Sequence, residues 1–216
     1  MRARLSRDAP LLLATRSDGK LRELVPMFEE AGIPAIGLDA AGIALAPDED
    51  AVEQFDTFEE NARAKAQYFA RLSGRPVVAD DSGLEVVALG GRPGVRSKRW
   101  SGRDDLTGRA LDAANNAALL AALEGMSERR ARYVCVAALA TGGTVRCWRG
   151  ETSGRVLDAP AGDDGFGYDP YFFSDELGMT FGEADRAAKE RVSHRGRAFA
   201  ALIEELRKEL GARVRS

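Results

Sequence analysis

The sequence predicts an α/β protein built on a mixed β-sheet. Short apolar segments with the character of strands alternate with segments in which apolar residues recur at helical spacing. Two strand-like runs, residues 133–140 and 144–151, flank a Thr-Gly-Gly turn and predict a β-hairpin, which adds antiparallel pairing to the sheet. The length of 216 residues is enough for one large domain or two small lobes with a core.

The N-terminal part predicts strand, helix and strand in succession. Residues 11–14 read as a buried strand, residues 15–19 as a turn, and residues 33–38 as a second strand. The helix between them is indicated by four apolar residues, Leu21, Leu24, Val25 and Phe28. It is expected to end near Gly32, and Pro26 is expected to kink it or to cost it a hydrogen bond.

The middle of the chain begins with an acidic segment, residues 48–60, which holds seven carboxylates and no Lys or Arg. From Thr57 an apolar stripe predicts a helix that stops at Gly74. Residues 76–79 and 84–89 predict two strands on either side of the polar sequence Asp80-Asp81-Ser82-Gly83. Residues 90–94 predict a loop, and residues 106–124 an Ala- and Leu-rich helix.

The C-terminal part follows the hairpin, whose sheet is expected to continue to residues 156–157. Residues 162–170 predict a glycine-rich loop that leads into a strand at residues 171–173. Ser193 is a suitable N-cap for a final helix. The apolar stripe of that helix is Phe199, Leu202, Ile203, Leu206 and Leu210.

Composition excludes several classes of protein. The 31 Lys and Arg residues nearly balance the 34 Asp and Glu residues, and a net charge of −3 argues against a general nucleic-acid or membrane-surface binder. The single histidine excludes a multi-His metal site, and the two cysteines, Cys135 and Cys147, exclude a disulfide framework. The apolar run at residues 11–14 is too short for a signal peptide, so we expect a cytoplasmic protein, with residues 1–9 as an N-terminal extension expected to be disordered.

Three polar segments are candidates for phosphate and metal chemistry. Residues 15–20 open a helix, whose N-terminal N–H groups attract anions, although a solvated strand-to-helix turn is the alternative. Glu59-Glu60-Asn61 starts the next helix, where acidic residues also simply complement the helix dipole. Asp80 and Asp81 are the carboxylate type that Mg²⁺ prefers, and because adjacent side chains diverge, we expect only one of them to bind metal.

Two further segments are candidates for recognition of a base. Phe166 lies between glycines beside Tyr168 and Asp169, so it is a possible stacking platform, or else a ring folded into the core. The basic stretch from residue 186 to 197 holds Lys189 and the sequence Ser193-His194-Arg195. Arginine there suits a phosphate or a base carbonyl, whereas the general alternative is a solvated basic face.

Together these segments make the chain resemble the inosine triphosphate pyrophosphatase family, from about Leu11 to the C-terminal helix. The sequence motifs that show the resemblance are, in this order, LLLATRSDGKLREL, TFEENARAKA, ADDSGLEV with LGGRPGVRSKRWSG, GFGYDP and VSHRGRAFAAL. The family usually shows Thr-Gly-Asn before the first lysine, where this chain has Thr15-Arg16-Ser17. Ser17 still offers a hydroxyl in place of the usual Asn.

The resemblance implies an elongated mixed sheet flanked by helices, one pyrophosphatase domain of two lobes with a nucleotide cleft between them, and a homodimer. It implies Mg²⁺-dependent hydrolysis of ITP, dITP or XTP to the monophosphate and pyrophosphate. It places Asp81, Glu60 and Lys20 in catalysis, with Glu60 and Asp81 at the metal and Asp81 as general base. The implied substrate-binding residues are Thr15, Arg16, Ser17, Asp18, Gly19, Lys20, Lys65, Asp80, Ser82, Phe166, Gly167, Tyr168, Asp169, Lys189, His194 and Arg195.

The residue types suit this chemistry, because a cation and a lysine neutralise charge on phosphoryl oxygens while a carboxylate positions the attacking water. Donors from His194 and Arg195 suit the keto oxygen of hypoxanthine or xanthine and oppose the amino group of adenine. Two alternatives stay open. One is a septum-associated nucleotide pyrophosphatase of related fold that prefers modified pyrimidines, and the other is a nucleotide sensor without turnover.

Overall fold

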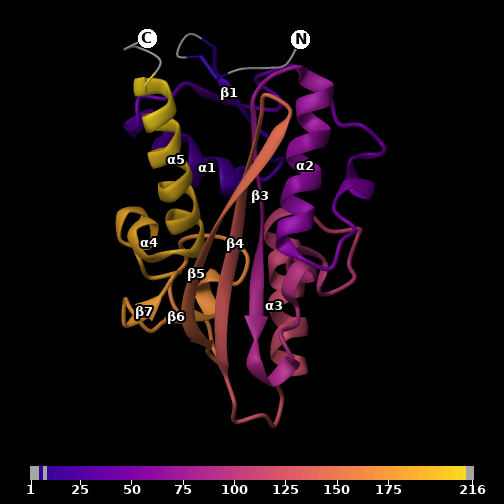
Figure 1. The fold of residues 1–216 in the computed structure, drawn as a ribbon. Helices are drawn as coiled ribbons and strands as arrows, with labels where there is room; N and C mark the ends of the chain where they lie inside the picture. The colour runs from indigo at the N-terminus through magenta and orange to yellow at the C-terminus, as the bar shows by residue number, and fades with distance from the viewer. Residues whose placement is uncertain (1–4, 7–8, 213–216) are drawn as a thin grey trace. The chain divides into compact units, whose positions relative to one another are not determined.

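The computed structural model describes residues 5–6 and 9–212, which form a mixed seven-stranded β-sheet flanked by helices (Figure 1). The strand order is β2-β1-β3-β4-β5-β6-β7. The chain divides into two compact units, each of which is described separately below. The first comprises residues 1–81, 136–149 and 198–216, and the second residues 82–135 and 150–197.

The strands confirm the predicted mixture of parallel and antiparallel pairing. β1 pairs in parallel with both β2 and β3, whereas β6 pairs antiparallel with β5 and β7. The hairpin of β4 and β5 turns at Gly142 and Gly143, whose φ values of 61° and 87° lie in the left-handed region that a two-residue hairpin turn requires. The bounds are β1 Leu11–Leu13, β2 Ala35–Gly37, β3 Val77–Val86, β4 Arg130–Thr141, β5 Thr144–Val156, β6 Phe172–Ser174 and β7 Met179–Thr180.

The helices begin largely where polar side chains can cap them. Ser17 and Thr57 each accept a hydrogen bond from the backbone N–H three residues later, and Asp185 does the same for a short helix. The α-helices are α1 Asp18–Glu30, α2 Phe58–Ser73, α3 Gly108–Ala122, α4 Arg186–Val192 and α5 His194–Ala212. The 3-10 turns are η1 Glu49–Val52, η2 Val87–Leu89, η3 Gly94–Arg99 and η4 Asp169–Tyr171.

The first unit has its core around β1 and the first part of β3. In Figure 1 the ribbons of β3 and β4 lie between α2 and α5. Phe28 of α1 and Phe199 of α5 are fully buried and meet edge to face, with ring centroids 6.1 Å apart. This core supports the end of β1, after which the predicted phosphate-binding residues 15–20 follow, and the first part of β3, which carries Asp80 and Asp81.

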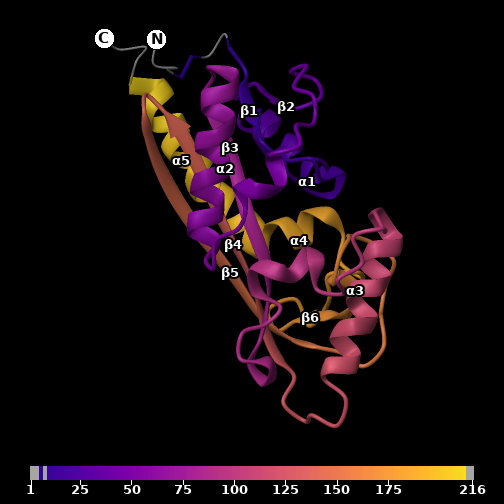
Figure 2. The ribbon, with the colours of Figure 1, turned by 90° about the vertical axis from the view of Figure 1, so that its right-hand side faces the viewer.

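The second unit has its own aromatic core. Tyr133 of β4 contacts Phe172 and Phe181 at centroid distances of 4.7 and 5.9 Å, and Leu119 of α3 is buried in the same cluster. Figure 2 shows α3, α4 and β6 of this unit. The cluster anchors the segments on either side of the glycine-rich loop 162–170.

The polar sequence Asp80-Asp81-Ser82-Gly83 corrects the prediction of two strands separated by a loop. These four residues lie inside the continuous ten-residue strand β3. Asp, Ser and Gly are disfavoured in strands, but β3 lies between β1 and β4 in the sheet, and strand pairing outweighs that local preference. The carboxylates therefore lie on a rigid strand and not on a mobile turn.

Other boundaries also differ from the prediction. Residues 87–89 form the turn η2, which is closed by a hydrogen bond from the Gly90 N–H to the carbonyl of Val87. α1 begins at Asp18, within the predicted turn, and continues through Pro26, whose ring nitrogen has no hydrogen to donate. Helix α4 and strand β7 were not predicted, since both are too short to show a clear periodicity.

The predicted N-terminal extension, residues 1–9, falls largely outside the described residues. Across residues 5–6 and 9–212, the structure contains no helix with the length and apolarity needed to cross a membrane.

Candidate functional site

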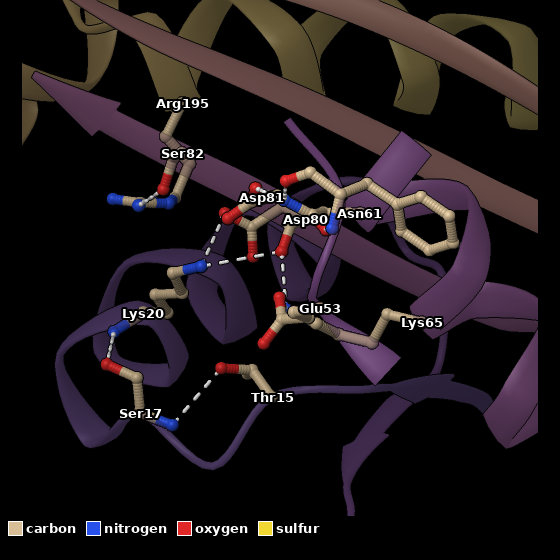
Figure 3. Close-up of polar contacts among 11 residues, drawn as sticks. Thr15, Ser17, Lys20, Glu53, Asn61, Lys65, Asp80, Asp81, Ser82 and Arg195 are labelled. Carbon is tan, nitrogen blue, oxygen red and sulfur yellow. Dashed lines mark hydrogen bonds and ion pairs between the residues drawn. The ribbon is translucent and has the colours of Figure 1, made fainter. Parts of the chain in front are cut away.

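The turn between β1 and α1 brings three predicted phosphate-binding residues together (Figure 3). The Ser17 N–H donates to Thr15 Oγ1 at 3.1 Å, and Ser17 Oγ accepts from the Lys20 N–H at 3.3 Å. Asp18 and Gly19 form the first turn of α1. The turn thus combines a helix N-terminus with two hydroxyl groups and the ammonium of Lys20, a combination that suits an anion.

Asp80 is a buried carboxylate, 1% exposed, that is compensated by lysine. Lys20 Nζ lies 3.0 Å from its Oδ2, and Lys65 Nζ donates to its backbone carbonyl at 2.8 Å. Burial by itself lowers the pKa of Lys65, but the negative charges of Glu53, Asp80 and Asp81 outweigh burial and raise this pKa overall. Lys65 therefore stays charged among three carboxylates.

Asp81 is a buried carboxylate with a raised pKa. Its side chain accepts a hydrogen bond of 3.0 Å from Asn61 Nδ2, and the residue is 9% exposed. Burial raises its pKa to about 6, against the smaller opposing effects of Lys65 and Lys20. Without a bound metal, a carboxyl group with this pKa changes protonation near neutral pH, and a cation bound beside it would lower this pKa.

Two residues beside Asp81 were not assigned a role from the sequence. Asn61 is held by Phe55, whose N–H donates to Asn61 Oδ1 at 2.9 Å and whose carbonyl accepts from Asn61 Nδ2 at 3.1 Å. Glu53 forms an ion pair with Lys65, and its charge further raises the pKa of Asp81. Glu53 could have been found from the sequence through its place in the acidic segment 48–60. Asn61 could have been found through its position one turn into α2.

Glu60 and Arg16 have contacts that the sequence did not suggest. Glu60 accepts a hydrogen bond of 2.7 Å from Thr57 Oγ1, and its N–H donates to the same oxygen, so Thr57 caps α2 and holds the Glu60 carboxylate at the start of the helix. The Arg16 guanidinium pairs with Glu49 through two hydrogen bonds of 3.1 and 2.7 Å, and with Asp39 at 2.8 Å. Arg16 thus holds residues 39–49 to the turn that precedes α1.

The donor set of this unit fits a magnesium ion that is shared with a nucleotide. Within residues 5–6 and 9–212, no cluster of three or more His, Cys, Asp or Glu side chains could hold a metal ion by itself. Mg²⁺ bound with nucleotides needs only one or two protein carboxylates, because phosphate oxygens and water complete its shell. Asp81 is a buried carboxylate on a rigid strand, and Glu53 is close enough to affect its pKa, so these residues fit such an ion.

The second unit holds the predicted base-recognition residues. Asp169 Oδ2 accepts from Lys189 Nζ at 2.7 Å and from the Phe166 N–H at 2.8 Å. Arg195 donates to Ser82 Oγ at 2.8 Å (Figure 3). Lys189 and Arg195 lie 5.2 and 5.6 Å from the centre of the Phe166 ring, so two cations are near the predicted stacking platform.

His194 and Arg195 begin α5 and are both buried. The His194 ring stacks on Tyr133 with a centroid distance of 4.5 Å and an angle of 6° between the rings. Ser193 Oγ accepts from the Gly196 N–H at 3.0 Å, which confirms the predicted N-cap. A Cβ atom at Gly196 would collide with the carbonyl of Glu190, so only glycine permits this close approach of α5 to α4.

Gly167 and Tyr168 support the loop through separate contacts. The Tyr168 hydroxyl donates to the carbonyl of Ser97 at 2.7 Å, and burial raises the pKa of this phenol. Gly167 is bound on both of its backbone groups by α3, through Asp112 and Asn116. The sequence did not single out either of these α3 residues.

Comparisons with known proteins show the family of the chain. Residues 11–205 match the Ham1 family. The chain is 46% identical to a dITP/XTP pyrophosphatase of Syntrophobacter fumaroxidans, over 91% of this chain and 82% of that protein. It is also 46% identical to a dITP/XTP pyrophosphatase of Geobacter sulfurreducens, over 91% of this chain and 96% of that protein.

The chain also resembles solved structures that are described as a HAM1 protein and as a dITP/XTP pyrophosphatase. A HAM1 protein from Coxiella burnetii superimposes with a TM-score of 0.79 at 33% identity, and the match covers 92% of this chain and 98% of the other. A nucleoside-triphosphatase and dITP/XTP pyrophosphatase from Mycobacterium abscessus gives a TM-score of 0.68 at 40% identity, over 90% and 98% of the two chains. At these identities the similarity extends beyond the fold to the sequence.

Proposed function

Since the chain belongs to the Ham1 family, we propose that it hydrolyses the non-standard purine nucleoside triphosphates dITP, ITP and XTP to the monophosphate and pyrophosphate. The structural observation that carries this proposal is Asp81, a buried carboxylate with a pKa of about 6 beside two lysines. A nucleoside triphosphate pyrophosphatase needs such a base, with cations near it, to activate water against a charged phosphate.

The phosphate end of the substrate is assigned to the first unit. Thr15, Ser17 and Lys20 present hydroxyls, a helix N-terminus and an ammonium to it. Lys65 adds a second ammonium beside Asp80, which keeps both lysines in place. The Arg16 guanidinium is bound to Glu49 and Asp39. We therefore propose that Arg16 does not bind phosphate directly but fixes residues 39–49 beside the phosphate-binding turn.

Mg²⁺ is the metal that we propose, with Asp81 as its principal ligand and Glu53 or Glu60 as the second carboxylate. The ion, when bound, supplies positive charge that neutralises the phosphate oxygens. Asn61 fixes one oxygen of Asp81, so the carboxylate keeps a single orientation on β3. Asp81 then accepts a proton from the water that attacks the α-phosphorus, and pyrophosphate leaves.

The purine is assigned to the second unit. Phe166 is a partly exposed residue suited to stacking, and Lys189 and Arg195 lie near its ring. His194, which stacks on Tyr133, is proposed as a further donor to the base. Donors that face the keto oxygen at C6 oppose the amino group of adenine. A site built to hydrogen-bond one substrate group can reject an analogue that lacks it by about 10⁴- to 10⁵-fold.

The experiment that tests this function is a pyrophosphate-release assay with dITP, XTP and ATP, with and without Mg²⁺. We expect pyrophosphate from dITP and XTP, little reaction of ATP, and no turnover after Asp81→Asn. Asp158→Asn is the matched control, because Asp158 is an exposed carboxylate paired with Arg129. Release of orthophosphate alone, or equal turnover of ATP, contradicts the proposal.

Three further expectations rest on the family resemblance and stay proposals. They are a homodimer, a cytoplasmic location, and one pyrophosphatase domain of two lobes. Light scattering of the purified protein tests the first. A dITP KM that rises on substitution in either unit, at Lys20 or at Phe166, tests the last.

A further inference from the structure

The glycine-rich loop around Phe166 is held by hydrogen bonds on three sides, and one of these sides is helix α3. The Gly167 N–H donates to Asp112 Oδ2 at 3.0 Å, and the Gly167 carbonyl accepts from Asn116 Nδ2 at 2.9 Å. Asp112 and Asn116 are four residues apart, so they lie on the same face of α3. One helix face therefore fixes both backbone groups of the residue that follows Phe166.

The remaining neighbours of Phe166 are fixed independently. The Phe166 N–H donates to Asp169, which Lys189 also binds, and the Tyr168 hydroxyl donates to Ser97. Gly165 has no space for a side chain, because a Cβ atom there would collide with the Asp169 carboxylate. The Phe166 ring, however, is partly exposed and lies within 5.6 Å of Arg195. The loop is thus a rigid frame around one accessible ring.

The orientation of the Asn116 side chain leaves one of its polar atoms buried without a hydrogen bond in the described part of the chain, which costs folding free energy. The residue is 7% exposed, and its Oδ1 is buried without a hydrogen-bond partner among the described residues. A buried acceptor that is unsatisfied costs about 1–3 kcal/mol. The opposite orientation of the amide would direct its oxygen at the carbonyls of Gly167 and Asp112, which its NH₂ group now contacts. The orientation of the Asn116 amide is therefore set by the two carbonyls that its NH₂ group donates to, and one of these belongs to Gly167 in the loop.

We propose that Asp112 and Asn116 are positioning residues for purine recognition, which hold the Phe166 ring in place through the Gly167 backbone. This inference rests on the proposed function, since it concerns the same base-recognition residues. Its physical basis is preorganisation. A ring that is already fixed loses little conformational freedom when a base stacks on it. Neither residue touches the substrate in this proposal, and neither acts on the phosphates.

The test compares Asp112→Ala and Asn116→Ala with the wild-type chain. We expect Asp112→Ala to raise the KM for dITP about tenfold, as for loss of one hydrogen bond to a charged group, and Asn116→Ala to raise it by about three- to tenfold, as for a neutral hydrogen bond. In both variants kcat is expected to change less than about twofold. Inhibition by tripolyphosphate, which has no base, is expected to stay within about twofold of wild type. Asp112→Asn keeps an acceptor oxygen and is expected to restore most of the dITP affinity. Arg109→Ala, on the exposed side of α3, is the matched control and is expected to behave as wild type.

A double-mutant cycle with Phe166→Ala separates positioning from a general structural role. If Asp112 acts through the ring, Asp112→Ala adds less than about twofold to the KM once Phe166 has been removed. A full tenfold effect in the Phe166→Ala background overturns the proposal. An equal loss of tripolyphosphate affinity in Asp112→Ala also overturns it, because that pattern indicates general unfolding of the unit.

Binding of dIMP, measured by calorimetry, keeps this proposal distinct from the proposed function. Absence of dITP hydrolysis by the wild-type chain counts against the pyrophosphatase activity alone. In that case, weaker dIMP binding by Asp112→Ala still supports the positioning role. Unchanged dIMP binding by both α3 variants refutes the positioning role, whatever the activity of the wild type.

Discussion

Asp81→Asn is expected to make the metal-free protein more stable while it removes catalysis. The carboxylate is 9% exposed, and its pKa is raised from 3.8 to about 6, mainly by burial. Folding at neutral pH therefore keeps Asp81 charged in surroundings that favour its neutral form. Asparagine is nearly isosteric, is uncharged, and its oxygen can still accept the hydrogen bond from Asn61.

The magnitude follows from the two pKa values. The difference between 3.8 and about 6 corresponds to about 3 kcal/mol, at one pKa unit per 1.36 kcal/mol. Because the pKa is raised on folding, the folded protein binds more protons than the unfolded chain between these values. Wild-type stability from this group is thus fully present below about pH 4 and is lost as the pH rises through about 6. The advantage of Asp81→Asn is expected to be about 3 kcal/mol near pH 8 and less than about 1 kcal/mol near pH 4.

The assay is urea unfolding of both proteins in EDTA at several pH values, with the free energy of unfolding taken from each transition. Asp158→Asn serves as the control and is expected to change this energy by less than about 0.5 kcal/mol, since Asp158 is on the surface. The reasoning is refuted if Asp81→Asn is no more stable than the parent near pH 8. It is equally refuted if the advantage grows toward acid pH, because the sign of the pKa shift would then be wrong.

Three other substitutions test separate parts of the structure. Lys65→Met leaves the carboxylates around it without their shared cation and is expected to lower kcat/KM for dITP by at least about 100-fold in the pyrophosphate-release assay. The control Lys208→Met, at an exposed lysine, is expected to leave kcat/KM unchanged. Arg16→Gly strands the largely buried Glu49 carboxylate and is expected to cost about 1–3 kcal/mol of unfolding free energy, and an unchanged urea midpoint contradicts the role given to this pair. Phe28→Ala removes a fully buried ring and is expected to cost about 3–5 kcal/mol in the same measurement, so a loss below about 1 kcal/mol would show that the core is arranged differently.

Most of the fold could be predicted because its longer elements carry strong local patterns. The hairpin of β4 and β5 follows from two apolar runs around Gly142 and Gly143, and α2 from a capped stripe that ends at Gly74. Helix α4 and strand β7 could not be predicted in this way, because seven and two residues are too few to show a period. β3 was divided in error, since local propensity at Asp80–Gly83 opposes the strand that sheet pairing imposes.

The candidate site was only partly visible in the sequence. The residue types at Lys20, Asp81 and Lys189 indicated phosphate, metal and base chemistry. Glu53 was not singled out, and Asn61 was named within a candidate segment but given no role of its own, because a carboxylate in an acidic run and an asparagine on a helix have many ordinary roles. Their importance depends on proximity to Asp81, which is a property of distance in space.

The sequence by itself determined which elements this chain can form, which family it resembles, and which kinds of side chain are available for chemistry. Those properties are local or compositional, so the order of residues is enough to read them. Only the tertiary structure decided that Asp80 is compensated by two lysines, that Asp81 has a pKa of about 6, and that α3 holds Gly167. Burial and charge pairing arise between segments that are distant along the chain, and they set the protonation and rigidity of each group only once the chain has folded.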